Sequence, residues 1–325
     1  MTDVPKNLLR LENFVGNTPL VRLFCEIESK KVEIYAKYEP WNYTGSIKDR
    51  MVLQILKSGY SNGTLKPGDT IVEATSGNTG IALAAMGAYL GHRVEIYMPS
   101  WMSEERKRLL RFYGAKLFQI NVEQGGFMKC IDLAAKKSQK NGYFGPKQFD
   151  NTWNVMAHVN STAPELENTL KSNDLGNLNV FTTGMGTGGT IMGFHHYFSQ
   201  KKHSFKAYPI LPSKNEDGEH RIEGIGDSFI PKIVDLEALS PVLRVNDSDA
   251  INIARQINKL GLSVGISSGA NVFGAVLQAF VSPGSYNIGT VLCDCNKKYL
   301  TTDLCSESEE ALSRDIKVLN YELLS

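Results

Sequence analysis

The 325-residue sequence has no long apolar run and no strong imbalance of charge. Its longest apolar stretch, near Ile81 to Leu90, is far shorter than the roughly 20 residues that a membrane span needs. The formal net charge is +1, so neither a nucleic acid nor a membrane is expected as a partner. The first residues lack a basic segment followed by an apolar core, so no signal peptide is predicted and a cytoplasmic protein is expected.

The cysteines also lack the even, clustered pattern of a disulfide framework. They lie at Cys25, Cys130, Cys293, Cys295 and Cys305. An odd, scattered set favours reduced thiols in a reducing compartment. Cys293 and Cys295 form a single C-x-C with no second ligand pair nearby, so buried or partly buried thiols on a strand are favoured over a zinc site. No metal is expected.

What the sequence does contain is an alternation of strand-like and helix-like segments. Thr70 to Ala74 is rich in strand-forming residues, and Thr79 to Leu90 is apolar on all sides, as a buried helix would be. Further strands are predicted at 93–98, 115–121, 179–183 and 205–211, and further helices at 104–113 and 190–200. This order predicts an α/β fold of two closely joined lobes, each a mostly parallel twisted sheet with helices on both faces.

Two charged segments are predicted to face solvent. The helix at 104–113 carries charges along most of its length. The run from Asp303 to Glu310 is acidic and is predicted to be a solvated tail.

Three glycine-containing segments suggest one shared crevice, because ligands of open α/β sheets bind at the carboxyl ends of strands. They are Gly45–Lys48, Thr75–Gly80 and Gly184–Thr190. In the third, the glycines let several N–H groups point at one anion, and the following helix adds its positive end. Thr187 and Thr190 supply hydroxyl donors. The segment therefore predicts a phosphate-binding loop.

Two other interpretations of that loop are weaker. Gly184, Gly186 and Gly189 fit the dinucleotide pattern G-x-G-x-x-G. That pattern needs an acidic residue at the end of the next strand, and the first carboxylate after it is Glu216. A glycine-rich turn without a ligand is also less favoured, since three such turns rarely converge without a function.

Lys48 follows a Gly-Ser turn and precedes the apolar segment Met51–Leu53, so a loop-to-helix junction is predicted. Burial there would lower the pKa of the amine and make it a nucleophile toward an aldehyde. A solvated lysine in a charged run with Asp49 and Arg50 is the alternative, and spacing alone does not decide between them.

A series of motifs, in order along almost the whole chain, resembles the cysteine synthase and cystathionine β-synthase family of fold-type-II pyridoxal-phosphate enzymes. The motifs are GNTPLVRL (16–23), NYTGSIKDR (42–50), EATSGNTGIALA (73–84), QF (148–149), GTGGT (186–190), EGIG (223–226), GISSGAN (265–271) and KYLTT (298–302). The resemblance implies a tryptophan-synthase-β-like fold. It also implies a smaller mobile lobe at 45–154 and a larger lobe made of 1–44 and 155–325.

The same resemblance implies roles for individual residues. Lys48 would bind pyridoxal 5′-phosphate covalently and act as the catalytic base. The phosphate would be held by Gly186, Thr187, Gly188, Gly189 and Thr190. Asn78 would contact the 3′-oxygen of the cofactor, and Ser267 its pyridine nitrogen, with the neighbouring Ser268 as the alternative. The substrate carboxylate would be bound by Thr75, Ser76, Thr79 and Gln148.

The activity implied is β-replacement on an activated serine through an aminoacrylate intermediate, in which O-acetylserine and sulfide give cysteine. A second possibility is a cysteine β-lyase that releases hydrogen sulfide or forms serine, lanthionine or cystathionine. A third, a catalytically silent partner-binding homologue, is disfavoured by the intact cofactor motifs. The resemblance further implies a homodimer and a cleft that binds the C-terminal tail of serine acetyltransferase.

Some positions depart from the family pattern. Trp41 and Tyr43 flank Asn42 where the family usually has Asn-Pro, and Trp153 brings an indole near the substrate region. Asp227 follows the EGIG motif, where cysteine synthases tend to have a small residue. A carboxylate there could orient or deprotonate an incoming water or thiol, which would make it catalytic. Alternatively, it caps the turn before Phe229.

Overall fold

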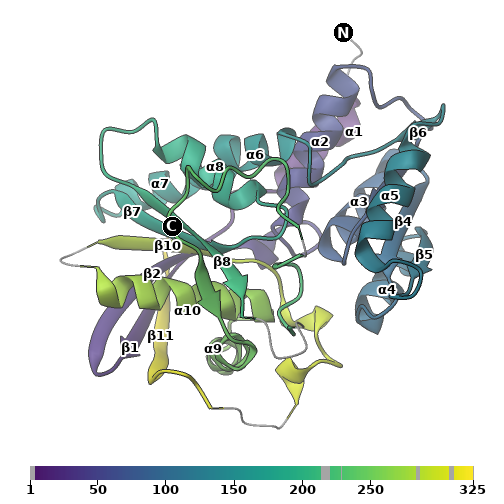
Figure 1. Cartoon of the computed structure of the whole chain (residues 1–325). Coiled ribbons are helices and arrows are strands. Elements are labelled where there is room, and N and C mark those ends of the chain that lie inside the picture. The colour runs from purple at the N-terminus through teal and green to yellow at the C-terminus, as the bar shows by residue number, and fades with distance from the viewer. Residues whose placement is uncertain (1–3, 214–219, 228, 283–285, 307–310, 325) are drawn as a thin grey trace.

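The computed structural model describes residues 4–213, 220–227, 229–282, 286–306 and 311–324. They form two sheets with helices packed on both faces of each (Figure 1). The larger sheet has the order β11-β1-β2-β10-β7-β8-β9, and the smaller has the order β5-β4-β3-β6. The predicted α/β fold of two mostly parallel sheets is therefore confirmed.

The strands of the larger sheet come from both ends of the chain: β1 (Leu20–Ile27), β2 (Lys30–Tyr38), β7 (Leu178–Gly184), β8 (Lys206–Pro212), β9 (Leu243–Val245), β10 (Asn287–Leu292) and β11 (Ile316–Leu324). Strands β2, β10, β7, β8 and β9 run parallel to one another. Strand β1 is antiparallel to both β2 and β11.

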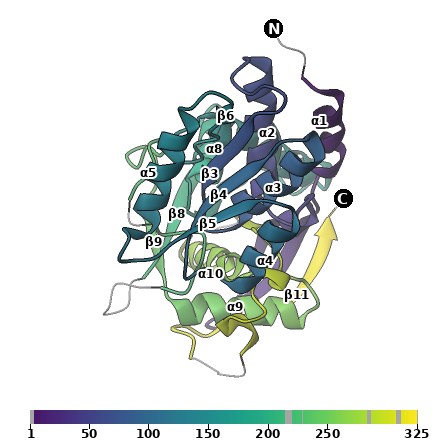
Figure 2. The ribbon, with the colours of Figure 1, turned by 90° about the vertical axis from the view of Figure 1, so that its right-hand side faces the viewer.

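The smaller sheet is wholly parallel and is formed by one continuous part of the chain (Figure 2). Its strands are β3 (Thr70–Ala74), β4 (Val94–Pro99), β5 (Lys116–Ile120) and β6 (Tyr143–Phe144).

The helices are α1 (Lys6–Leu11), α2 (Lys48–Ser61), α3 (Asn78–Leu90), α4 (Glu104–Phe112), α5 (Gly126–Ser138), α6 (Trp153–Ala157), α7 (Ala163–Ser172), α8 (Gly189–Phe198), α9 (Asp247–Lys259) and α10 (Ile266–Val281). Helices α7 and α8 cover one face of the larger sheet, and α9 and α10 cover the other (Figure 1). In the smaller sheet, α3 lies on one face and α5 on the other. The predicted strands and helices between 70 and 212 agree with these bounds to within two residues.

Two predictions about charged segments are wrong. Helix α4 is not simply exposed, because Arg106 and Lys107 are buried, with 3% and 6% of their surface accessible. The acidic run is not a free tail either. Its first residues form a short 3-10 helix (Asp303–Cys305) with Leu304 buried, and the chain then returns to the larger sheet as β11. Residues 307–310 of that run lie outside the described residues.

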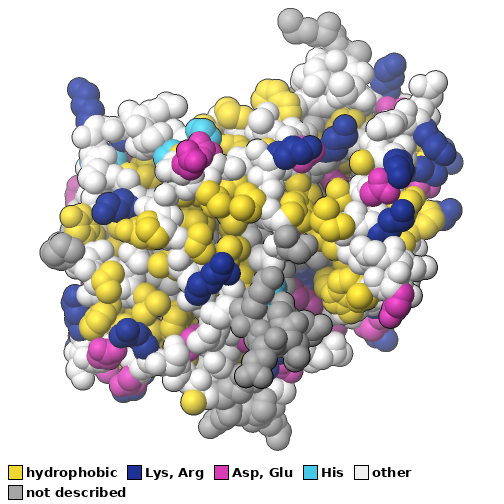
Figure 3. Space-filling model, in the orientation of Figure 1, with side chains coloured by type: hydrophobic (Ala, Val, Ile, Leu, Met, Phe, Trp, Pro, Cys, Tyr) yellow, Lys and Arg dark blue, Asp and Glu magenta, His cyan; other side chains and the backbone are white. Residues whose placement is uncertain are grey.

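Apolar and charged side chains are interspersed over the face of the molecule seen in Figure 3. Over the described residues, no helix combines the length and hydrophobicity that crossing a membrane requires. All five cysteines are unpaired, and Cys25 and Cys130 are buried.

Candidate active site

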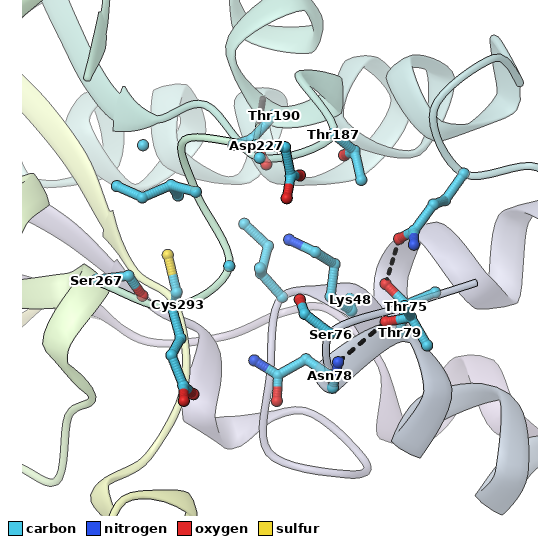
Figure 4. A pocket seen from close by; sticks show the side chains of 18 of the residues that line it. Lys48, Thr75, Ser76, Asn78, Thr79, Thr187, Thr190, Asp227, Ser267 and Cys293 are labelled. Atoms are coloured by element: carbon cyan, nitrogen blue, oxygen red, sulfur yellow. Dashed lines mark hydrogen bonds between the residues drawn. The ribbon is translucent and has the colours of Figure 1, made fainter. Parts of the chain in front are cut away.

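One pocket gathers residues from both sheets at the carboxyl ends of their strands (Figure 4). It is lined by the loop after β3, by the end of β7 and the loop that follows, and by Cys293 directly after β10. All three glycine-containing segments identified in the sequence contribute to it. The position follows from the parallel topology, which brings strand ends that are far apart in sequence to one edge.

Lys48 begins helix α2 and is half-buried in this pocket. The backbone beside it is fixed from two sides. Asp49 accepts hydrogen bonds from the amide and hydroxyl of Thr44 at 2.8 and 2.6 Å, and the Ile47 amide donates to the Cys293 carbonyl at 2.9 Å. The amine therefore projects from a rigid turn, between Asp227 and Asn78 (Figure 4).

A buried charge cluster stabilises the same turn of α2. The Arg50 guanidinium binds both oxygens of Glu39, at 2.6 and 2.9 Å, and both oxygens of Glu165, at 2.7 and 2.8 Å. Lys37 adds an ion pair with Glu165 at 2.8 Å. Burial would raise the pKa of Glu165, but Arg50 and Lys37 together lower it to about 2. Burial alone would lower the pKa of Arg50, and the two carboxylates raise it instead.

The loop from β7 to α8 has the geometry of a phosphate site. Gly186, Thr187 and Thr190 line the pocket, while Gly188 and Gly189 shape the turn behind them. Gly188 has φ +83°, and a Cβ on Gly189 would lie only 1.9 Å from the Asn154 side-chain oxygen. Amide groups at the start of α8 and two threonine hydroxyls thus face one small space, which fits a phosphate group.

Asn154, on α6, supports this loop and was not singled out in the sequence. Its amide nitrogen donates to the Thr187 hydroxyl at 2.9 Å and to the Gln148 carbonyl at 2.9 Å. It therefore links the phosphate loop to the segment that carries Gln148. Its neighbour Trp153 is 40% exposed and is not among the residues that line the pocket.

The opposite end of the pocket contains Asn78 and Ser267. The Asn78 amide nitrogen donates to buried Asp294 at 2.7 Å, and its oxygen accepts from Lys298 at 2.9 Å, so its orientation is fixed. Ser267 lines the pocket, whereas Ser268 turns away and accepts from the Cys293 amide at 2.9 Å. Of the two serines considered for the pyridine nitrogen, only Ser267 faces the pocket.

The Cys293 thiol also faces the pocket (Figure 4). Burial raises its pKa to about 11, although the Lys48 charge opposes this shift. The sequence gave no signal for this placement, because it depends on where β10 ends relative to Lys48.

The loop after β3 presents Thr75, Ser76 and Thr79 to the pocket, together with Gln148. The Thr79 hydroxyl donates to the Gln148 side-chain oxygen at 2.6 Å, and the Gln148 amide nitrogen donates to the Ala74 carbonyl at 2.6 Å. The four predicted carboxylate-binding residues are therefore brought together in a bonded loop.

Glu73 lies just behind that loop. Burial raises its pKa to about 7, while the hydrogen bonds that it accepts from the Ala74 and Gln148 amides oppose the shift.

Asp227 lines the pocket opposite the Lys48 side chain (Figure 4). Burial raises the pKa of its carboxyl to about 6, and the positive charge of Lys48 acts in the opposite direction. The group is therefore mostly a carboxylate above pH 6, and it can gain or lose a proton close to neutrality. Such a carboxyl group is suited to general acid–base chemistry.

A mobile-proton carboxylate, a lysine on a rigid turn and a phosphate site in one pocket define the class of pyridoxal-phosphate enzymes. The family described as "Pyridoxal-phosphate dependent enzyme" matches residues 11–294. Cysteine synthase of Staphylococcus aureus is 34% identical over 303 residues, covering 91% of this chain and 96% of that protein. Cysteine synthase B of Campylobacter jejuni is 37% identical over 302 residues, covering 91% and 98%.

Among solved structures, a hydrogen sulfide-producing enzyme from Fusobacterium nucleatum superposes with a TM-score of 0.92 at 42% identity, covering 98% of this chain and 99% of that one. An aspartate-to-asparagine mutant of that hydrogen sulfide-producing enzyme is known in complex with an α-aminoacrylate intermediate. The chain belongs to the pyridoxal-phosphate-dependent family of cysteine synthases, and its fold is fold type II.

Proposed function

We propose that the protein breaks the Cβ–S bond of cysteine, releases hydrogen sulfide and adds water at Cβ to give serine. The observation that carries this proposal is the Asp227 carboxyl, which lies in the pocket opposite Lys48 and has its pKa raised to about 6. Atoms balance in the overall reaction, in which cysteine and water give serine and hydrogen sulfide. The 42% identity with a hydrogen sulfide-producing enzyme adds support.

The charge of Asp227 favours water over sulfide as the nucleophile. Sulfide is largely an anion near neutral pH, and a carboxylate in the same partly buried pocket repels it. Water is neutral and needs a base to become a good nucleophile. A carboxylate with a pKa of about 6 can accept that proton at neutral pH.

The other residues bind and position the substrate and the cofactor. Bound pyridoxal phosphate supplies an aldehyde for Lys48 and a ring that withdraws electrons from the substrate Cα. Lys48 takes the proton from Cα, and Ser267 donates a hydrogen bond to the ring nitrogen, which leaves the ring a moderate electron sink.

The remaining predicted site residues hold the two ends of this assembly. The phosphate is bound by Gly186, Thr187, Gly188, Gly189 and Thr190. The 3′-oxygen is contacted by Asn78. The amino-acid carboxylate is bound by Thr75, Ser76, Thr79 and Gln148.

A second candidate is cysteine synthesis from O-acetylserine and sulfide. The cysteine synthases of two bacteria, 34% and 37% identical over nine-tenths of this chain, favour it. Both reactions use the same cofactor and Lys48, and they differ in the group that leaves Cβ and the group that attacks it.

Product analysis separates the two candidates. The holoenzyme is incubated with cysteine alone, and in parallel with O-acetylserine plus sulfide, and sulfide, serine and cysteine are quantified by mass spectrometry. We expect equal amounts of serine and sulfide from cysteine, at a higher kcat/KM than cysteine formation from O-acetylserine. A higher kcat/KM for cysteine formation would refute the proposal and favour synthesis.

Lys48→Ala is the control for cofactor attachment. We expect it to abolish the visible absorption of the bound cofactor and the release of sulfide. If the variant keeps both the absorption and the activity, the assignment of Lys48 is wrong.

We also propose that the protein is a homodimer that pairs through exposed aromatic side chains. Phe14 is 62% exposed, and its ring centroid lies 6.1 Å from that of Tyr43. Tyr43 is in turn close enough to Tyr89 and Tyr113 for their charges to affect its pKa. An exposed aromatic patch of this kind is typical of a protein interface.

Light scattering coupled to size-exclusion chromatography tests this pairing. Phe14→Lys should shift the protein toward monomer, whereas Val281→Lys, at a similarly exposed position, should not. A monomeric wild-type protein, or a dimer unaffected by Phe14→Lys, would exclude this interface.

A further inference from the structure

A buried ion pair crosses the pocket and joins the two sheets' halves of the site. Arg106 belongs to α4, beside the smaller sheet, and Glu223 precedes Asp227 in the loop that covers the pocket. Arg106 Nη1 and Glu223 Oε2 are partners, and their side chains are 3% and 21% exposed. Both residues line the pocket, yet neither was identified as a site residue from the sequence.

Arg106 lies directly on the loop after β3. A Cβ added to Gly77 would lie 2.4 Å from Arg106 Cδ, so the glycine leaves the space that the arginine side chain occupies. On its other side the guanidinium stacks over the Tyr299 ring, 4.8 Å from the centroid. A side chain confined in this way transmits a shift of the loop rather than absorbing it.

Glu223 belongs to a segment that is also bound to the phosphate loop. The Gly226 amide donates to the Met185 carbonyl at 3.1 Å. The Gly224 carbonyl packs against Gly186, where a Cβ would lie 2.2 Å from it. The segment 223–227 is therefore held to the phosphate loop at one end and, through Glu223, to α4 at the other.

We infer that the Arg106–Glu223 ion pair positions Asp227, so that binding of the amino acid to the loop after β3 sets the location of the base that activates water. This inference rests on the proposed function, because it gives the ion pair a task only in the addition of water. Arg106 and Glu223 are positioning residues that act through Asp227. Removing Sγ from the substrate does not depend on them.

The test compares the holoenzyme with Glu223→Gln, Asp227→Asn and the double variant, using cysteine as substrate. Rapid-quench measurements give the rate of sulfide release in the first turnover and the rate of serine formation. Glu104→Gln is the matched control, because it removes one carboxylate from an exposed ion pair with Lys107 on the same helix.

We expect Glu223→Gln to slow serine formation about tenfold, a usual size of coupling between residues in contact, while the first release of sulfide keeps its rate. Asp227→Asn should slow serine formation more, and adding Glu223→Gln to it should have no further effect. Arg106→Lys, which keeps the charge but loses the stacked guanidinium, should slow the same step as Glu223→Gln.

Multiplying effects of Glu223→Gln and Asp227→Asn in the double variant would overturn the inference and leave the proposed function intact, as would a Glu223→Gln variant that behaves like Glu104→Gln. Unchanged serine formation in Asp227→Asn would instead remove both the proposed base and the ion pair's role.

Discussion

Replacing Asp227 by asparagine should make the folded protein more stable at neutral and alkaline pH. The pKa of Asp227 is raised from 3.8 to about 6 in the folded protein, with burial as the main cause. The folded state therefore binds this proton more tightly than the unfolded state does. Stability falls as the pH rises from the unfolded pKa through the folded one, and it stays lower above pH 6.

The size of this effect follows from the shift. Two pKa units correspond to about 3 kcal/mol, which is the upper limit of the gain at pH 8. Part of the Asp227 side chain contacts water, and asparagine brings an amide with hydrogen-bonding needs of its own, so about 1–2 kcal/mol is expected. At pH 5, between the two pKa values, the gain should be about half as large.

Urea unfolding followed by circular dichroism at pH 5 and pH 8 measures this difference. Asp132→Asn is the control, because Asp132 is exposed and a hydrogen bond from Lys136 lowers its pKa, so its replacement should give no gain. The reasoning is refuted if Asp227→Asn is no more stable than the wild type at pH 8, or if its gain does not shrink at pH 5. Together with a loss of serine formation, a gain would mean that the carboxylate is kept for activity at a cost in stability.

Two further predictions concern the frame of the site. Arg50→Leu leaves the buried carboxylate of Glu39 without its guanidinium, so we expect a loss of about 3–5 kcal/mol in the free energy of unfolding by urea titration; a loss below about 1 kcal/mol would contradict this. Gly189→Ala places a methyl group 1.9 Å from the Asn154 oxygen, so we expect pyridoxal phosphate to bind at least about tenfold more weakly in a fluorescence titration, with Ser172→Ala unchanged; equal affinities would show that the loop adapts.

The sequence predicts the parts of the fold that repeat a local pattern. From residue 70 to residue 212, alternating hydrophobic segments and glycine turns place strands and helices to within two residues. The edge of the larger sheet was not anticipated. Strands β1 and β11 pair antiparallel, and no local feature near Ile316 indicates that its partner is Ile27.

The site shows the same division. The motifs that suggest a lysine, a phosphate loop and a carboxylate loop are contiguous, and the pocket gathers all three. Asn154, Arg106 and Cys293 gain their places only through contacts with remote segments. Arg106 was misjudged because a charged helix usually faces water, whereas here a carboxylate and an aromatic ring accompany the guanidinium into the interior.

The order of strands in the larger sheet has a consequence for how the protein is made. Strand β2 pairs with β10, and β1 pairs with β11, so the first strands to leave the ribosome must wait for the last. The smaller sheet needs only residues 70–144 and can close while synthesis continues. Since the Cys293 carbonyl holds the turn that carries Lys48, the nascent chain cannot assemble a complete cofactor pocket until nearly all of it has been translated.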